Sequence, residues 1–189
     1  MGTIDTSQFR KGLKIEMESV PWEIVDFQHV KPGKGTAFVT TRIKNLIRGN
    51  TIDKTFRSGD VVGEADCEEV QCDYLYSDGS NWHFMNKESY EQFEIAADSV
   101  GEARYFLIDN SSCSVLMHNN KPIQIYPPNF VVMRLTDCDP AVQGNTATGA
   151  TKVVTTETGY KVAVPLFITI TDKLKIDTRD GRFIERAGK

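Results

Sequence analysis

The sequence predicts an all-β protein made of three small β-barrels in series. Short runs rich in β-branched and aromatic residues recur along the chain and are separated by turn residues. Some of these runs alternate apolar and charged residues, as in Leu13-Lys14-Ile15-Glu16-Met17, which is typical of a half-buried strand. A polar stretch at residues 58–66 and the pair Pro127-Pro128 divide the chain into pieces of about 60 residues, the size of a small barrel. We therefore expect domains at residues 1–64, 65–128 and 129–189.

The first segment is expected to form an SH3-like barrel. Trp22–Phe27 and Phe38–Ile43 are rich in aromatic and branched residues, and Arg48-Gly49-Asn50 marks a turn. About five short strands in about 60 residues fit a barrel of this kind.

The second segment is expected to form an OB-like barrel from two hairpins and short helical pieces. Ser77-Asp78-Gly79-Ser80 has the composition of a hairpin turn, and so does Asn119-Asn120. The expected elements are strands at Cys67–Tyr76, Asn81–Asn86, Ser112–His118 and Ile123–Tyr126, with helical pieces at Glu88–Phe93 and Ala96–Leu107.

The third segment is expected to form a second OB-like barrel. Pro127-Pro128 stiffens the connection to it, because proline fixes φ and has no backbone N–H. Residues 144–150 are small and predict a surface loop. The expected strands are Phe130–Leu135, Val153–Thr155, Tyr160–Val164, Leu166–Ile170 and Leu174–Ile176.

Composition indicates a soluble, cytoplasmic chain without a metal or another cofactor. Hydrophobic residues make up 40% and charged residues 25%, which is ordinary for a globular protein. No apolar run approaches the ~20 residues that span a membrane, and the first residues lack the pattern of a secretory signal. The four cysteines lack Cys-x-x-Cys spacing, so we expect reduced thiols and no zinc site.

The charge is distributed unevenly. The net charge of −4 divides into +2 for residues 1–64, −8 for 65–128 and +2 for 129–189. Residues 29–57 contain seven basic side chains and one acidic side chain, Asp53. This pattern predicts either a phosphate-rich partner at one end of the molecule or an ordinary solvated strand face. The candidate phosphate contacts are Arg42, Lys44, Arg48 and Lys54.

A hairpin tip in the first segment presents a lysine. The tip is Lys31-Pro32-Gly33-Lys34-Gly35, between two strand-like runs. Glycine permits φ > 0 and close approach of another molecule, and Pro32 restricts Lys31 to extended geometry. The tip is not a Walker loop, because no Lys-Ser/Thr pair and no helix pattern follow. By itself, a Gly-Lys-Gly motif is more often an ordinary turn with a solvated lysine.

No enzyme active site is recognisable, so the residues favour a binding module. The serines lack a nucleophile-elbow setting, and His83 lies between Trp82 and Phe84 in a predicted strand, where packing is the commoner role. Small β-barrels with a basic end often bind nucleic acids. Aromatic side chains that could stack on bases, although burial is favoured for each, are Trp22, Phe27 and Phe38.

Several blocks resemble bacterial elongation factor P, a relative of the hypusine-bearing translation factor of eukaryotes and archaea. Val30–Phe38 is similar to the tip loop of that family. The remaining blocks lie in the same order and cover nearly the whole chain: Tyr74–Gly79, Trp82–Met85, Pro127–Phe130, Val164–Ile168 and Lys175–Gly181.

The resemblance implies a translation elongation factor and not an enzyme. Its three barrels, the first of the KOW type, would form an L shape like that of a tRNA. It would bind the ribosome, both RNA and protein, between the peptidyl and exit sites and steady the acceptor end of the peptidyl-tRNA at consecutive prolines. Lys34 would be extended, in many members by a β-lysyl group, through an enzyme resembling a lysyl-tRNA synthetase.

The resemblance also implies contacts at the C-terminal end of a monomer. Gly144, Asn145, Thr146 and Ala147 would lie near exit-site messenger RNA, and Arg186 belongs to the C-terminal signature. Phe183 stands where many members have tyrosine, which removes any role that needs a hydroxyl there. A paralogue of the family lacks the Pro-Gly-Lys-Gly tip, so Lys34 argues against it. A free single-stranded RNA-binding protein of the cold-shock type is the open alternative.

Overall fold

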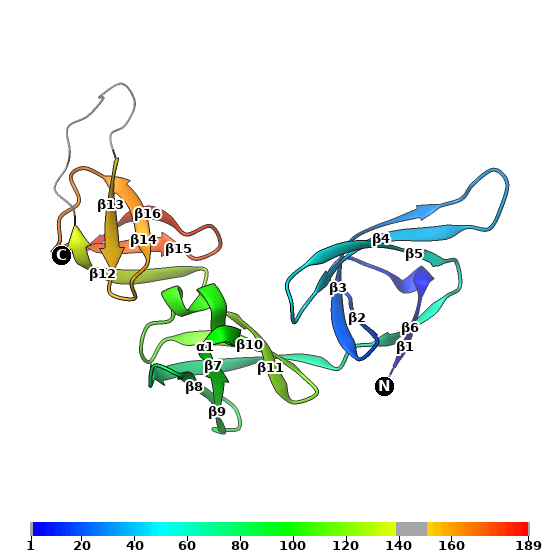
Figure 1. The fold of residues 1–189 in the computed structure, drawn as a ribbon, viewed down its shortest axis with the longest axis horizontal. Coiled ribbons are helices and arrows are strands. Elements are labelled where there is room, and N and C mark those ends of the chain that lie inside the picture. The colour runs from blue at the N-terminus through cyan, green and yellow to red at the C-terminus, as the bar shows by residue number, and fades with distance from the viewer. Residues whose placement is uncertain (1, 139–150, 189) are drawn as a thin grey trace. The chain divides into compact units, whose positions relative to one another are not determined.

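A computed structural model describes residues 2–138 and 151–188, and strands dominate that part of the chain. The strands form three sheets, one after another along the sequence (Figure 1). This arrangement confirms the predicted all-β fold class.

The N-terminal sheet has six strands in the order β1-β6-β2-β3-β4-β5. Neighbours in this sheet pair antiparallel. A short 3₁₀ helix, η1 (Thr6–Gln8), follows β1 and begins with a capping box, in which Asp5 and Gln8 bond each other's backbone. The strands are β1 (Thr3–Asp5), β2 (Lys14–Met17), β3 (Val20–Val30), β4 (Phe38–Asn45), β5 (Thr51–Arg57) and β6 (Val61–Glu64).

Alternation along β4 explains how this sheet buries one face. Val39, Thr41 and Ile43 are buried, whereas Arg42 between them is exposed. A strand places successive side chains on opposite faces, so one face of β4 packs into the barrel and the other meets solvent. The core under this face comprises Ile4, Phe9, Ile15, Ile24, Val39, Ile43 and Phe56.

The middle sheet has five strands in the order β11-β10-β7-β8-β9. Asn119 and Asn120 join β10 to β11 with φ of 49° and 61°, the left-handed pair that a tight hairpin turn uses. Both predicted hairpins of this segment are therefore present. The strands are β7 (Cys67–Ser77), β8 (Asn81–Asn86), β9 (Gln92–Ala96), β10 (Ser112–His118) and β11 (Lys121–Tyr126).

One of the two predicted helical pieces in this segment is wrong. Residues 87–89 form a turn, residues 90 and 91 are irregular, and Gln92 begins β9, so Glu88–Phe93 contains no helix. The Asn86 side chain closes this turn by accepting the backbone N–H groups of Glu88 and Ser89. The other piece is helical, as α1 (Ala97–Val100) followed by the 3₁₀ helix η2 (Gly101–Phe106).

The C-terminal sheet also has five strands, in the order β14-β13-β12-β15-β16. The predicted strand at Leu166–Ile170 is wrong, because residues 166–171 form turns. There the Asp172 carboxylate accepts the Thr169 N–H at 2.8 Å and its hydroxyl at 2.9 Å, which fixes a bend. The strands are β12 (Phe130–Cys138), β13 (Thr151–Thr156), β14 (Lys161–Pro165), β15 (Lys173–Asp177) and β16 (Arg182–Gly188).

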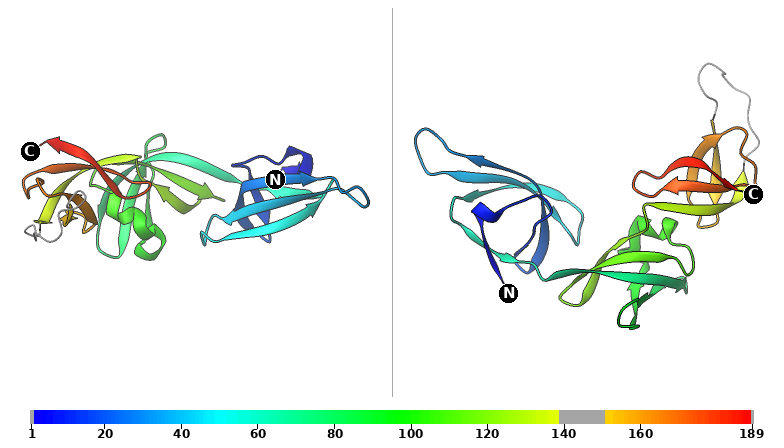
Figure 2. Two further views of the ribbon diagram at one scale, coloured as in Figure 1. Left: turned by 90° about the horizontal axis from the view of Figure 1, so that it is seen from above. Right: turned by 180° about the vertical axis from the view of Figure 1, so that it is seen from behind.

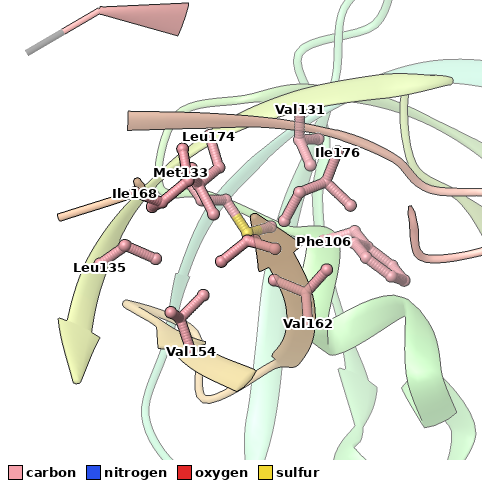
Figure 3. Packing of buried hydrophobic residues seen from close by; sticks show 10 residues of the cluster. Phe106, Val131, Met133, Leu135, Val154, Val162, Ile168, Leu174 and Ile176 are labelled. Carbon is pink, nitrogen blue, oxygen red and sulfur yellow. The ribbon is translucent and has the colours of Figure 1, made fainter. Parts of the chain in front are cut away.

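The core of the C-terminal sheet includes a side chain from the middle segment of the chain. Phe106, at the end of η2, points into the cluster of aliphatic side chains from the strands (Figure 3). Its ring centroid lies 4.9 Å from that of Tyr160. The buried members of the cluster are Phe106, Val131, Met133, Leu135, Val154, Val162, Val164, Ile168, Leu174 and Ile176.

The chain divides into two compact units. One contains Met1–Val70 with Val115–Gln124, and the other contains Gln71–Ser114 with Ile125–Lys189. The turn of the β10–β11 hairpin therefore belongs to the same unit as the N-terminal sheet. Within that unit, the loop that joins β3 to β4 projects beyond the strands of the sheet (Figure 2).

Candidate functional site

The lysine-bearing tip is the loop between β3 and β4. The last pair of the ladder is Val30 with Phe38, so residues 31–37 connect the two strands. Every residue from Lys31 to Gly35 is exposed. The predicted hairpin tip is therefore present, with its lysines in solvent.

One of the two tip glycines adopts a backbone that requires glycine. Gly35 has a φ of 111°, which L side chains rarely adopt, whereas the φ of Gly33 is outside that region. A Cβ at either position would meet no closer atom than Pro32 Cγ, at 3.9 Å from Gly35. Gly35 thus shapes the turn, and Gly33 leaves open space beside Lys34.

The two tip lysines make no ion pair with any residue that the structure describes. Their amines are thus available to another molecule, whether a modifying enzyme or an RNA phosphate. A lysine carries one compact charge on a four-carbon stem, so an amide-linked extension lengthens its reach and adds donors.

The base of the tip is held by backbone bonds. The Ser58 N–H, just after β5, donates to the Ala37 carbonyl at 2.9 Å. Below it, β3 and β4 are paired from Phe38 to Asn45, and β5 extends the ladder on the other side of β4. The lysine side chain is therefore free while the strands that present it are fixed.

Arg42 lies in a network of opposite charges. Its Nε is 3.0 Å from Asp53 Oδ1 on β5, and Asp26 lies opposite on β3. The hydrogen bond with Asp53 raises the pKa of the Arg42 guanidinium. Lys11 Nζ in turn is 2.9 Å from Asp26 Oδ1. Arg42 lines a shallow hollow of about 210 Å³ together with Asp26 and Asp53. The positive charge of Arg42 is therefore largely compensated by these two carboxylates.

The other predicted phosphate contacts differ in position and surroundings. Lys44 pairs in register with Glu23. Arg48 is exposed in the turn between β4 and β5, about 23 Å or more from the tip end of β4 by strand rise. Lys54 pairs with Thr41, on the sheet face opposite to that of Arg42, and its Nζ lies 5.6 Å from the Phe56 ring centroid.

A basic residue absent from the predicted contacts, Arg57, lies at the tip end of the sheet. It pairs in register with Phe38, the first residue after the tip loop. Arg57 shares the outer face with Arg42. Its cross-strand partner Phe38 is four residues before Arg42 on β4, and residues an even number apart on a strand face the same side. The strand register, which composition does not provide, is the signal that identifies it.

The C-terminal candidates are placed differently. Arg186 is exposed on β16, with its Nη1 3.8 Å from Asp172 Oδ1. Phe183 is half-buried and packs against the C-terminal core. The loop candidates Gly144, Asn145, Thr146 and Ala147 lie outside the described residues.

The three aromatic candidates of the N-terminal sheet are half-buried. Trp22 and Phe27 pack against the core, as the sequence favoured. Phe27 also makes an edge contact with His29 at 5.6 Å between ring centroids.

Across residues 2–138 and 151–188, no three His, Cys, Asp or Glu side chains form a group that could hold a metal ion. No helix in those residues is long and apolar enough to cross a membrane. Burial raises the pKa of the Cys72 thiol to about 11 and that of Cys113 to about 12, so both stay protonated at neutral pH.

Family models match the chain in three consecutive pieces. The elongation factor P (EF-P) KOW-like domain matches residues 5–62, the EF-P OB domain matches 67–125, and the elongation factor P C-terminal model matches 131–186. The chain belongs to the elongation factor P family. It is a translation elongation factor, and the KOW-like and OB models agree with the predicted barrel types.

Elongation factor P of Finegoldia magna (strain ATCC 29328 / DSM 20472 / WAL 2508) is similar along its whole length. It is 46% identical over 183 residues, which are 97% of this chain and 99% of that protein. The family assignment therefore covers all three sheets.

Two solved structures have a similar fold. Eukaryotic translation initiation factor 5A from Methanococcus jannaschii has a TM-score of 0.55 and 18% identity, and the match covers 64% of this chain and 90% of that one. A translation initiation factor eif-5a family protein from Naegleria fowleri ATCC 30863 has a TM-score of 0.52 and 12% identity, with 66% and 97% covered. At these identities the similarity concerns the fold alone.

Proposed function

We propose that this elongation factor P binds the ribosome between the peptidyl and exit tRNA sites and stimulates peptide-bond formation at consecutive prolines. Lys34 is the residue through which it acts, after post-translational extension. The observation that supports this most directly is the tip itself: an exposed lysine without an ion pair among the described residues, on a loop whose base is fixed by backbone bonds.

The factor contributes positioning and no chemistry of its own. Peptide-bond formation is slow when the reacting groups are badly oriented, and holding them in place lowers the entropic part of the barrier. A modified Lys34 at the acceptor end of the peptidyl-tRNA would supply this constraint. The paired strands β3, β4 and β5 suit this task, because they hold the loop that carries Lys34 in place and so limit the motion of its amine.

The remaining surface supplies ribosome binding. Arg48 and Lys44, at the far end of β4, and Arg186, on β16, are exposed or half-exposed cations that can meet RNA phosphates. The strongly acidic segment 65–128 suits basic protein surfaces of the ribosome. The other partners are exit-site messenger RNA near residues 144–147 and a lysine-modifying enzyme. We expect the factor to act as a cytoplasmic monomer.

Replacing Lys34 tests the proposal. The free energy of unfolding of Lys34→Ala should lie within about 0.5 kcal/mol of that of the parent protein, because an exposed turn side chain has little packing to lose. The same variant should lose stimulation of a polyproline reporter while a proline-free message is translated normally. Lys34→Arg keeps the charge and cannot receive an amide-linked extension, so it should fail equally.

Lys31→Ala is the matched control. Lys31 lies in the same loop, is equally exposed, and lacks an ion pair among the described residues.

Intact mass and peptide mapping of natively purified protein should place the added mass on Lys34. Full polyproline activity of Lys34→Ala, or native protein with Lys34 always unmodified, would refute the role of the modified lysine.

A further inference from the structure

A buried histidine joins the β10–β11 hairpin to the sheet that carries the tip. His118, the last residue of β10, is 7% exposed. Its Nε2 lies 3.1 Å from Oε2 of Glu16 on β2, a residue 102 positions earlier in the sequence. The Glu16 side chain is itself only 16% exposed. A carboxylate only accepts hydrogen bonds, so Nε2 carries the proton in this contact.

Backbone bonds surround this pair. The Asn119 N–H, in the hairpin turn, donates to the Asp66 carbonyl at 3.2 Å. The Ala65 N–H donates to the Lys14 carbonyl of β2, also at 3.2 Å. The short connection between β6 and β7 is thus bonded on one side to β2 and on the other to the hairpin turn, next to the His118–Glu16 pair.

The charged groups near the pair come from the same elements. Lys14 and Asp66 both act on the Cys67 thiol, together with Glu16. Burial is the main cause of the raised pKa of Cys67, and the two carboxylates raise it further while Lys14 lowers it. Asn119 Nδ2 lies 3.3 Å from His118 Nε2, a contact and not a hydrogen bond, because Nε2 is the donor to Glu16. The histidine is therefore enclosed by β2, the connection and its own turn.

We infer that His118 and Glu16 are positioning residues, whose bond holds the turn of the β10–β11 hairpin on β2 and fixes the direction in which the N-terminal sheet presents Lys34 relative to that turn, within one compact unit. This inference rests on the proposed function of Lys34. A connection of a few residues leaves a small barrel free to rotate, whereas a contact between distant segments restricts it. The hairpin is the element that supplies this contact, because its turn belongs to the same compact unit as the N-terminal sheet.

Amide hydrogen exchange measures the docking directly. In His118→Ala and Glu16→Ala the amides of Asn119 and Ala65 should exchange roughly tenfold to a hundredfold faster, because a hydrogen bond to a charged group is lost. The Leu46 amide, which donates to the Pro21 carbonyl inside the N-terminal sheet at 3.0 Å, should keep its rate. His118→Gln keeps an N–H donor for Glu16 and should restore most of the protection.

A local histidine–carboxylate pair provides the matched control. His83 Nε2 lies 3.0 Å from Asp78 Oδ2 within one hairpin, so His83→Ala removes the same kind of bond without joining distant elements. With Lys34 modification shown to be complete by mass, His118→Ala should stimulate the polyproline reporter several-fold less than the parent. His83→Ala should stimulate it fully.

The outcomes separate this inference from the function beneath it. Unchanged exchange at Asn119 and Ala65 in both alanine variants would overturn the docking role, and faster exchange with full polyproline stimulation would overturn the positioning role. If Leu46 also exchanges faster in His118→Ala, Glu16→Ala decides instead: faster exchange confined to Asn119 and Ala65 supports the docking role, and unchanged exchange there overturns it. An active Lys34→Ala would refute the proposed function, while the exchange rates would still decide whether the pair docks the hairpin.

Discussion

Gly181, in the turn between β15 and β16, is expected to tolerate no side chain. Its φ is 69°, and an added Cβ would overlap the Tyr160 hydroxyl and lie 2.9 Å from Tyr160 Cζ. That hydroxyl also donates to the Gly181 carbonyl at 3.1 Å. The Tyr160 ring is held in turn against Phe106, so it has little room to move. Gly181→Ala therefore both strains the backbone at residue 181 and displaces the packed ring of Tyr160.

The expected cost follows from these contacts. A left-handed alanine costs about 1–2 kcal/mol, loss of the tyrosine hydrogen bond about 0.5–1.5 kcal/mol, and ring displacement about 1–3 kcal/mol. If these three costs add, Gly181→Ala should lower the free energy of unfolding by about 2.5–6.5 kcal/mol. Gly159 is the control, because its φ is 82° and an added Cβ meets nothing within 4 Å. Gly159→Ala should pay the backbone cost alone, about 1–2 kcal/mol.

Urea unfolding followed by Trp82 fluorescence, in a Trp22→Phe background, provides the measurement. Trp82 lies in the same compact unit as Tyr160 and Gly181. In a Tyr160→Phe background the overlap with the hydroxyl disappears, so the penalty of Gly181→Ala should shrink. Equal losses for the two glycine variants, with no effect of Tyr160→Phe on their difference, would refute the reasoning.

Two further predictions concern charge. Replacing Lys44 and Arg48 by glutamine should weaken ribosome binding and reduce the slope of its log–log salt dependence by up to about two units. Arg42→Gln should change the slope less, because Asp53 already pairs with Arg42. An unchanged slope in the double variant would show that Lys44 and Arg48 are merely solvated. The pKa of Asp177 is lowered to about 2 by the side-chain hydrogen bond from Arg179, so its stabilisation is present above about pH 4 and is lost as pH falls toward 2. Urea titrations at several pH values should show a smaller acid-induced loss for Asp177→Asn than for the parent, and identical acid profiles would contradict this.

Local turn chemistry made much of the fold predictable from the sequence. Asn119-Asn120 is a turn because asparagine tolerates the left-handed region that a two-residue hairpin requires. Composition failed where a polar side chain closed a bend within a β-rich run. Leu166–Ile170 has strand composition, yet Asp172 folds it into a turn through Thr169. Such a bond depends on side-chain placement and is invisible to a pattern of apolar residues.

The tip was predictable because it is a local feature, whereas the charge pattern was not. Residues 29–57 look almost purely basic along the sequence. Antiparallel pairing, however, brings Asp26 opposite Arg42 and Glu23 opposite Lys44 from the preceding strand. Charge runs count neighbours along the chain, but a sheet compares residues across strands, so the strand register decides which charges stay uncompensated.

The same register explains why no carboxylate lies across a strand from Lys34. Its loop is beyond the last β3–β4 pair, Val30 with Phe38, so no neighbouring strand brings a carboxylate opposite it. A cation within the ladder faces a side chain of the next strand, as Arg42 faces Asp53. A lysine in the loop beyond the end of the ladder keeps its amine free, while the paired strands hold the two ends of that loop in place. Uncompensated charge and a rigid base are separate requirements, and the end of a paired hairpin satisfies both.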